Sequence, residues 1–151
     1  MNNFCHITQL VRGRIGPAVK PEFVPYIADS CLKFGSVVRS EKGEILIFKY
    51  PKDQSRDFIK RVIAVPGDTI EIKDGNVFVN DELQTENYIL SKCRGDYPKV
   101  TIPEGHIFVM GDNRNNSEDS RFPDVGFVPF DLIKGKAMVV FWPFADMKVL
   151  P

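Results

Sequence analysis

Short hydrophobic runs, separated by glycine, proline and polar residues, recur along most of the chain. The clearest runs are residues 44–48, 58–65, 107–110 and 137–142. Their length is typical of buried strands and too short for most helices. Turn signals follow them closely, such as Pro51 after the first run, and we expect a polar loop at residues 52–56. The pattern therefore predicts a mostly β chain.

A hairpin is predicted between residues 69–72 and 76–79, where apolar residues alternate with polar or small ones. The connection is Lys73-Asp74-Gly75, and its glycine can adopt a positive φ. A helical turn is suggested only at residues 131–133, and no segment has the pattern of an amphipathic helix.

Length and composition favour one domain over residues 1–151, with 43% hydrophobic and 26% charged residues. Residues 82–104 lack two-residue alternation and contain several Asn, Asp, Gly and Pro residues. We therefore expect this stretch to be a loop-rich excursion or small subdomain. The expected fold class is mostly β, with a small loop-rich second subdomain.

Charge and cysteine content exclude several classes of function. Twenty Lys and Arg balance twenty Asp and Glu and are scattered along the chain, which argues against nucleic acid as a partner. No apolar run reaches the roughly eighteen residues of a membrane span, and no signal peptide is evident. The cysteines, Cys5, Cys31 and Cys93, lack metal-site spacing, so we expect no metal, no cofactor and unpaired thiols. A single disulfide outside the cell is the alternative.

Two segments carry candidate chemistry. Lys60 lies within the apolar run 58–65, and burial there would disfavour its charged form and make the amine a general base. The alternative is a lysine that extends outward to solvent. The second segment is the polar cluster at residues 111–121, which taken alone would be an ordinary solvated loop.

Together these segments resemble the type I signal peptidases, membrane-anchored serine endopeptidases with a Ser/Lys dyad. In that family a Lys-Arg strand ending in Pro-Gly-Asp precedes a Gly-Asp-Asn…Ser-x-Asp-Ser-Arg loop, and here the resemblance covers roughly residues 43–143. It implies the family's antiparallel β fold, with Lys60 as the general base and Ser117 as the hydroxyl that orients the lysine amine. It also implies structural roles near the site for Arg61, Asp112, Asn113, Asp119 and Arg121.

The family's nucleophile motif, Ser-Met-x-Pro-Thr-Leu, is where this chain departs from the resemblance. The best match is residues 14–19, in which Pro17 takes the proline position and Arg14 the serine position. A guanidinium only donates hydrogen bonds and cannot attack a carbonyl. Ser30 and Ser36 are alternative nucleophiles, but they lack the Met and Pro context.

We therefore expect an extracytoplasmic signal-peptidase-like domain at a bacterial membrane that is proteolytically inactive. It would bind signal peptides or extended segments of exported or pilus proteins by strand addition. The alternative is an active type I signal peptidase that cleaves exported preproteins by the Ser/Lys mechanism. A third interpretation is that the first forty residues are an aberrant sequence fused to a normal core. Membrane attachment would need an anchor that this chain lacks.

Overall fold

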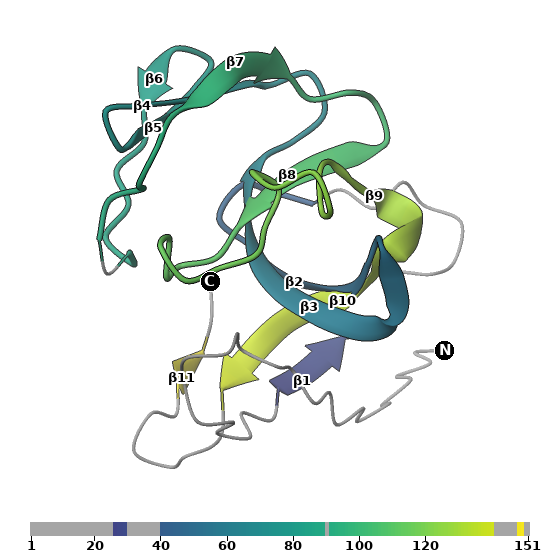
Figure 1. Cartoon of the computed structure of the whole chain (residues 1–151). Coiled ribbons are helices and arrows are strands. Elements are labelled where there is room, and N and C mark those ends of the chain that lie inside the picture. Colours follow the sequence, from purple (N-terminus) through teal and green to yellow (C-terminus); the bar gives the residue numbers. More distant parts are fainter. Residues whose placement is uncertain (1–25, 30–39, 90, 141–147, 150–151) are drawn as a thin grey trace, which may run out of the picture.

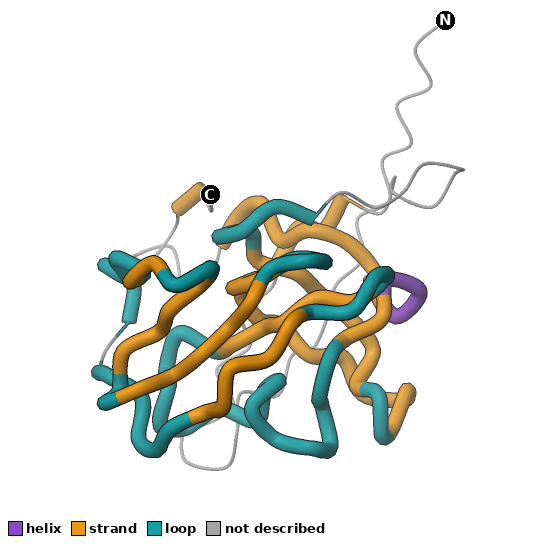
Figure 2. The backbone as a smooth tube through the Cα atoms, turned by 90° about the horizontal axis from the view of Figure 1, so that it is seen from above, coloured by secondary structure: helices purple, strands orange, loops and turns teal. Residues whose placement is uncertain are grey.

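The computed structural model describes residues 26–29, 40–89, 91–140 and 148–149. In these ranges the chain forms antiparallel strands and one short 3-10 helix (Figures 1 and 2). The prediction of a mostly β, antiparallel fold is confirmed. Among the helices of the described ranges, none is long and apolar enough to cross a membrane.

The larger sheet contains seven strands in the order β1-β10-β2-β3-β8-β9, with β11 paired to β10. Its strands are β1 (Tyr26–Asp29), β2 (Ile45–Tyr50), β3 (Asp53–Ala64), β8 (His106–Met110), β9 (Val128–Pro129), β10 (Ile133–Val140) and β11 (Lys148–Val149). The 3-10 helix η1 (Phe130–Leu132) lies at the predicted helical turn. Because β3 and β8 are neighbours, residues far apart in the sequence meet at the centre of this sheet.

The smaller sheet contains four strands in the order β6-β5-β4-β7. They are β4 (Thr69–Lys73), β5 (Asn76–Val79), β6 (Glu82–Leu83) and β7 (Tyr97–Thr101). The predicted hairpin is β4–β5, whose turn residues Asp74 and Gly75 have φ values of 52° and 74°, as in a two-residue type I′ turn. A Cβ on Gly75 would also lie 2.8 Å from the carbonyl oxygen of Cys93. Both the backbone and the close approach therefore require glycine.

The smaller sheet is a side branch between β3 and β8 (Figure 1). Two backbone hydrogen bonds close its base, from Gly67 N to Ile102 O at 2.9 Å and from Ile102 N to Asp68 O at 2.8 Å. The chain therefore leaves and re-enters the larger sheet at nearly the same point.

One loop prediction differs from the structure. The loop expected at residues 52–56 is wrong, because β3 begins at Asp53 and this residue pairs with Tyr50. Residues 53–56 are exposed, so no apolar alternation marks them as a strand. The stretch 82–104, expected to be a loop-rich excursion or small subdomain, contains the short strands β6 and β7, and its other described residues lie outside strands and helices. Its division into a subdomain stays a prediction.

Two buried cores meet at β8. Ile107 and Val109 pack with Leu46, Phe48, Phe58 and Val62 of the larger sheet. Phe108 and Met110 pack instead with Ile70, Ile72, Val77 and Val79 of the smaller sheet. Successive strand residues face opposite sides, so β8 contributes to both cores and delivers Gly111 at its end.

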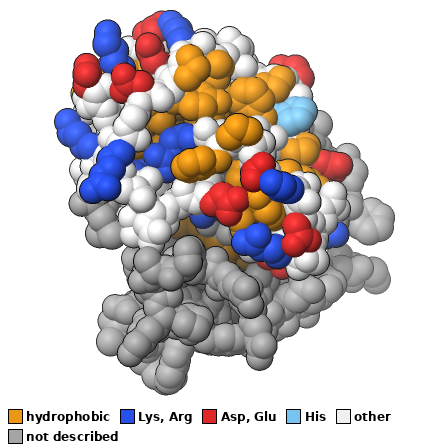
Figure 3. Space-filling view, in the orientation of Figure 1, with side chains coloured by type: hydrophobic (Ala, Val, Ile, Leu, Met, Phe, Trp, Pro, Cys, Tyr) orange, Lys and Arg blue, Asp and Glu red, His pale blue; other side chains and the backbone are white. Residues whose placement is uncertain are grey.

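Figure 3 shows hydrophobic side chains gathered on the face that carries the smaller sheet, with charged side chains around them. In the described ranges the exposed large hydrophobic residues are Leu83, Tyr88 and Phe122. Tyr88 lies beside the polar contacts of the candidate site described next.

Candidate active site

Lys60 lies in the middle of β3 among apolar neighbours. Phe58 and Val62 share its side of the strand, and Leu46 on β2 is its cross-strand partner. Its Nζ donates a hydrogen bond to Ser117 Oγ at 2.9 Å and lies 5.3 Å from the centroid of the Phe58 ring. The structure thus brings together the two residues predicted as general base and orienting hydroxyl.

Burial lowers the pKa of Lys60 below the ordinary value of 10.5. The carboxylates of Asp119 and Glu118 oppose this effect, because they favour the charged ammonium, but burial dominates. A larger fraction of Lys60 is therefore neutral near pH 7 than of an exposed lysine.

This pKa predicts how stability depends on pH. Between the folded-state pKa of Lys60 and 10.5, the unfolded chain binds more protons, so the free energy of unfolding rises with pH. Lys60→Met removes this contribution. We expect the free energy of unfolding of Lys60→Met, relative to that of the wild type, to fall from pH 7 to pH 10. Urea denaturation at both pH values measures this. The exposed-lysine variant Lys73→Met should show no such trend, and a difference independent of pH for Lys60→Met would contradict the prediction.

Gly111 has no side chain, and Ser117 occupies the space that a Cβ at this position would need. A Cβ at this position would lie 2.1 Å from Ser117 Oγ, 2.6 Å from Ser117 Cβ and 3.8 Å from Lys60 Nζ. Real Cβ atoms do not approach other atoms so closely, so any other residue here would move Ser117. The Lys60–Ser117 contact therefore depends on glycine at the end of β8.

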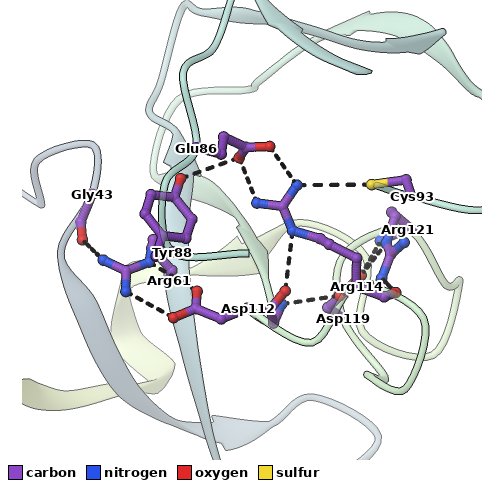
Figure 4. A network of polar contacts seen from close by, with 10 residues as sticks. Gly43, Arg61, Glu86, Tyr88, Cys93, Asp112, Arg114, Asp119 and Arg121 are labelled. Atoms are coloured by element: carbon purple, nitrogen blue, oxygen red, sulfur yellow. Dashed lines mark hydrogen bonds and ion pairs between the residues drawn. The ribbon is translucent and has the colours of Figure 1, made fainter. Parts of the chain in front are cut away.

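Arg61 attaches the start of loop 111–121 to β3 (Figure 4). Its Nε and Nη2 donate to the two carboxylate oxygens of Asp112 at 2.9 and 2.8 Å, and its Nη1 donates to the Gly43 carbonyl at 2.8 Å. The guanidinium lies 4.0 Å from the centroid of the Tyr88 ring. Two successive residues of β3 therefore hold the loop, Lys60 at Ser117 and Arg61 at Asp112.

A second ion pair closes loop 111–121 on itself. Asp119 is fully buried and accepts hydrogen bonds from Arg121 Nε at 2.7 Å and Nη2 at 2.8 Å. Asp119 also accepts one from the Gly111 backbone N–H at 3.1 Å, and Arg121 Nη2 donates to the Arg114 carbonyl at 2.6 Å. These contacts fix both ends of the segment that carries Ser117.

Arg114 links the same loop to the segment between β6 and β7 (Figure 4). Its guanidinium donates to both carboxylate oxygens of Glu86, and the two side chains are 1% and 6% exposed. Its Nε donates to the Gly111 carbonyl at 3.1 Å, and its Nη1 lies 3.7 Å from Cys93 Sγ. Burial opposes the charge of Arg114, but the bonds to Glu86 outweigh it and raise the pKa of the guanidinium.

The remaining predicted residues are placed as follows. Asn113 is exposed, and its carbonyl accepts a turn hydrogen bond from Asn116 N at 3.1 Å. Cys93 is a free, buried thiol. Arg14, Ser30, Ser36, Cys5 and Cys31 lie outside the described residues. In the part of the chain that the structure describes, no group of three His, Cys, Asp or Glu could hold a metal ion.

Sequence reasoning missed Arg114 and Glu86. Arg114 lies in the polar cluster singled out above, but its partner is 28 residues upstream. Opposite charge is the only signal that joins them, and many other carboxylates in the chain offer the same signal.

The family profile described as signal peptidase, peptidase S26, matches residues 21–142. The chain belongs to this signal peptidase family. The match includes both segments of the resemblance, the Lys60 strand and loop 111–121.

The chain is similar to part of the length of two curated signal peptidases. Probable signal peptidase I-2 of Synechocystis sp. is 43% identical over 116 residues, which cover 73% of this chain and 52% of the relative. Signal peptidase IB of Staphylococcus aureus is 40% identical over 126 residues, which cover 72% of this chain and 64% of the relative. The chain thus spans between half and two thirds of these relatives.

A solved signal peptidase structure has the same fold. The crystal structure of a signal peptidase I from Enterococcus faecalis V583 aligns with a TM-score of 0.60 and 28% identity. The alignment covers 68% of this chain and 100% of that one. The resemblance found in the sequence to signal peptidases is therefore confirmed at the level of both family and fold.

Proposed function

We propose that this chain cleaves the signal peptides of exported preproteins, with Lys60 as general base. The observation that carries the proposal is the hydrogen bond of 2.9 Å between the partly buried Lys60 amine and Ser117. A partly buried lysine whose pKa is lowered can accept a proton more readily near neutral pH than an exposed lysine can. Membership of the signal peptidase family supports the choice of substrate class.

The proposed reaction proceeds through an acyl-enzyme. A serine hydroxyl attacks the carbonyl carbon of the scissile bond while neutral Lys60 takes its proton. The resulting ammonium returns that proton to the leaving amine as the peptide bond breaks. Water then attacks the ester while Lys60 takes its proton, and the ammonium returns this proton to the serine oxygen as the ester bond breaks. Ser117 accepts one Nζ hydrogen throughout and so fixes the direction of the amine.

The nucleophile in this proposal is a serine outside the described residues, and Ser30 and Ser36 are the candidates. Among the described serines, Ser117 is the one whose hydroxyl bonds to Lys60, and it serves there as the orienting group. The site would face the extracytoplasmic side of a membrane, where exported preproteins emerge.

A second candidate function is peptide binding without cleavage. It is favoured by the match of residues 14–19 to the family's nucleophile motif, which aligns Arg14 with the serine. A domain of this kind would bind signal peptides, or extended segments of exported or pilus proteins, by adding the peptide as a strand to a sheet edge.

A cleavage assay separates the two functions. The substrate is a preprotein-derived peptide with small residues before the scissile bond, incubated at neutral to alkaline pH with wild type, Lys60→Ala, Ser30→Ala and Ser36→Ala. We expect cleavage that is lost in Lys60→Ala and in one serine variant but retained in the exposed-lysine control Lys73→Ala. Binding without cleavage by both wild type and Lys60→Ala would support the second function. Cleavage that persists in Lys60→Ala would reject the assigned base.

A further inference from the structure

A cluster at the end of β2 lies beside Lys60 and takes no part in the reaction proposed above. The Tyr50 hydroxyl donates a hydrogen bond to Glu118 Oε1 at 2.7 Å. The Tyr50 ring stacks on Phe58, with centroids 4.5 Å apart and planes inclined by 13°. Phe58 is the ring that lies 5.3 Å from Lys60 Nζ. Tyr50 therefore connects the aromatic surroundings of Lys60 to the residue that follows Ser117.

Glu118 differs from the other carboxylates near the lysine in its partner. The charged groups that act on Lys60 are Asp112, Glu118, Asp119 and Arg121 of loop 111–121. Arg56 of β3 lies 5.3 Å from the centroid of the same Phe58 ring. Lys136 of β10 is two strands away, opposite Leu46, and Glu44 directly precedes β2. Lys136 and Glu44 pair with each other at 2.9 Å, and Asp112 and Asp119 each accept two bonds from an arginine. Glu118 accepts its bond from a neutral hydroxyl, so its negative charge is not compensated by that bond.

We infer that Glu118, held in place by the Tyr50 hydroxyl, is a positioning residue that sets the pH range in which Lys60 is neutral. The inference rests on the proposed function only in treating Lys60 as a base. A nearby carboxylate favours the ammonium and so acts against burial. Glu118 is exposed, and without Tyr50 its side chain would move freely in solvent, where its effect on Lys60 would be screened.

The Tyr50 hydroxyl is suited to this role because it remains a donor. Burial and the hydrogen bond to Glu118 raise the pKa of Tyr50 to about 12. At neutral pH the phenol is therefore protonated and the contact with Glu118 persists.

Direct titration of Lys60 tests the inference without any substrate. The full-length protein is labelled with carbon-13 at lysine Cε and titrated by NMR, and the Lys60 signal is the one absent from Lys60→Arg. In Glu118→Gln we expect the Lys60 midpoint to move to lower pH, which increases its neutral fraction below the midpoint about two- to threefold. Tyr50→Phe should move it in the same direction by less. The control Glu82→Gln, an exposed carboxylate on β6, should leave it unchanged.

The double variant tests whether Tyr50 acts through Glu118. Tyr50→Phe combined with Glu118→Gln should titrate like Glu118→Gln alone, because the hydroxyl then has no carboxylate to hold. An unchanged Lys60 midpoint in Glu118→Gln would overturn the inference, as would a shift to higher pH in Tyr50→Phe.

Failure of the inference and failure of the proposed function are distinguishable. If Glu118→Gln shifts the Lys60 midpoint but the wild type cleaves no peptide, the role of Glu118 is supported and the proposed cleavage of signal peptides is rejected. In a protein that cleaves, the acid limb of the kcat/KM profile of Glu118→Gln should move to lower pH together with the midpoint.

Discussion

Replacing Gly111 by alanine is expected to displace Ser117 and to abolish its hydrogen bond with Lys60. The added Cβ would lie 2.1 Å from Ser117 Oγ, so the serine must move or the end of β8 must shift. Gly111 does not have a positive φ, so the effect is steric and not a matter of backbone preference. We expect a loss of about a hundredfold or more in kcat/KM for peptide cleavage, because the base loses its orientation. Overpacking should also destabilise the fold by about 1–3 kcal/mol.

The matched control is Gly105→Ala, at the turn before β8. Gly105 has a φ of +75°, and a Cβ there would meet nothing within 4 Å. This variant should cost about 1–2 kcal/mol of stability through backbone strain, with the Lys60 titration unchanged. The NMR titration of Lys60 and a denaturation curve measure both effects. A Gly111→Ala protein that titrates and cleaves like the wild type would contradict the steric argument.

Of the proposed single substitutions, removal of either partner of the Arg114–Glu86 ion pair should cause the largest loss of stability. The two side chains are 1% and 6% exposed, so Arg114→Ala leaves a buried carboxylate without its partner and Glu86→Ala leaves a buried guanidinium. We expect either variant to lower the free energy of unfolding by about 3–5 kcal/mol. Urea denaturation at neutral pH measures this, and loss of the bond from Arg114 to the Gly111 carbonyl should disturb the Lys60 titration as well.

An exposed pair and a double replacement serve as controls for that result. Lys52 and Asp124 pair at 2.7 Å but are 62% and 50% exposed, so Lys52→Ala should change stability by less than about 1 kcal/mol. Arg114→Met combined with Glu86→Leu should recover much of the loss, because no buried charge is left unpaired. If Arg114→Ala were as mild as Lys52→Ala, the pair would not be essential to the loop.

The sequence predicts the fold best where burial leaves a regular pattern. The β4–β5 hairpin follows from alternating residues on either side of Asp74-Gly75, and β8 follows from an apolar run of strand length. The first residues of β3 carry no such pattern, because they are exposed and their pairing with β2 depends only on backbone hydrogen bonds. Strand β7 was missed for the same reason, since its residues are mostly exposed.

The sequence also predicts some contacts of the candidate site and not others. The resemblance of two segments to signal peptidases predicts that Lys60 and Ser117 share one site, and in the structure Lys60 Nζ lies 2.9 Å from Ser117 Oγ. Contacts outside the two segments, such as that of Tyr50 with Glu118, span up to 68 residues and depend on how β2 and the loop meet in space. No local pattern encodes such a meeting. The assignment of Arg14 to the nucleophile position stays a prediction, since it falls outside the described residues.

The closed base of the smaller sheet has a consequence for how this protein can change over evolution. Because the hydrogen bonds between residues 67–68 and Ile102 bring the chain back to its starting point, changes at the exposed turns of the smaller sheet need not alter the pairing of β3 with β8. Residues of the smaller sheet that contact neither β8 nor loop 111–121 can therefore vary while Lys60 and Ser117 keep their distance. Glu86, and the residues packed on Phe108 and Met110, are not free to vary in this way. A domain built this way can acquire new specificities at its periphery without rebuilding its centre.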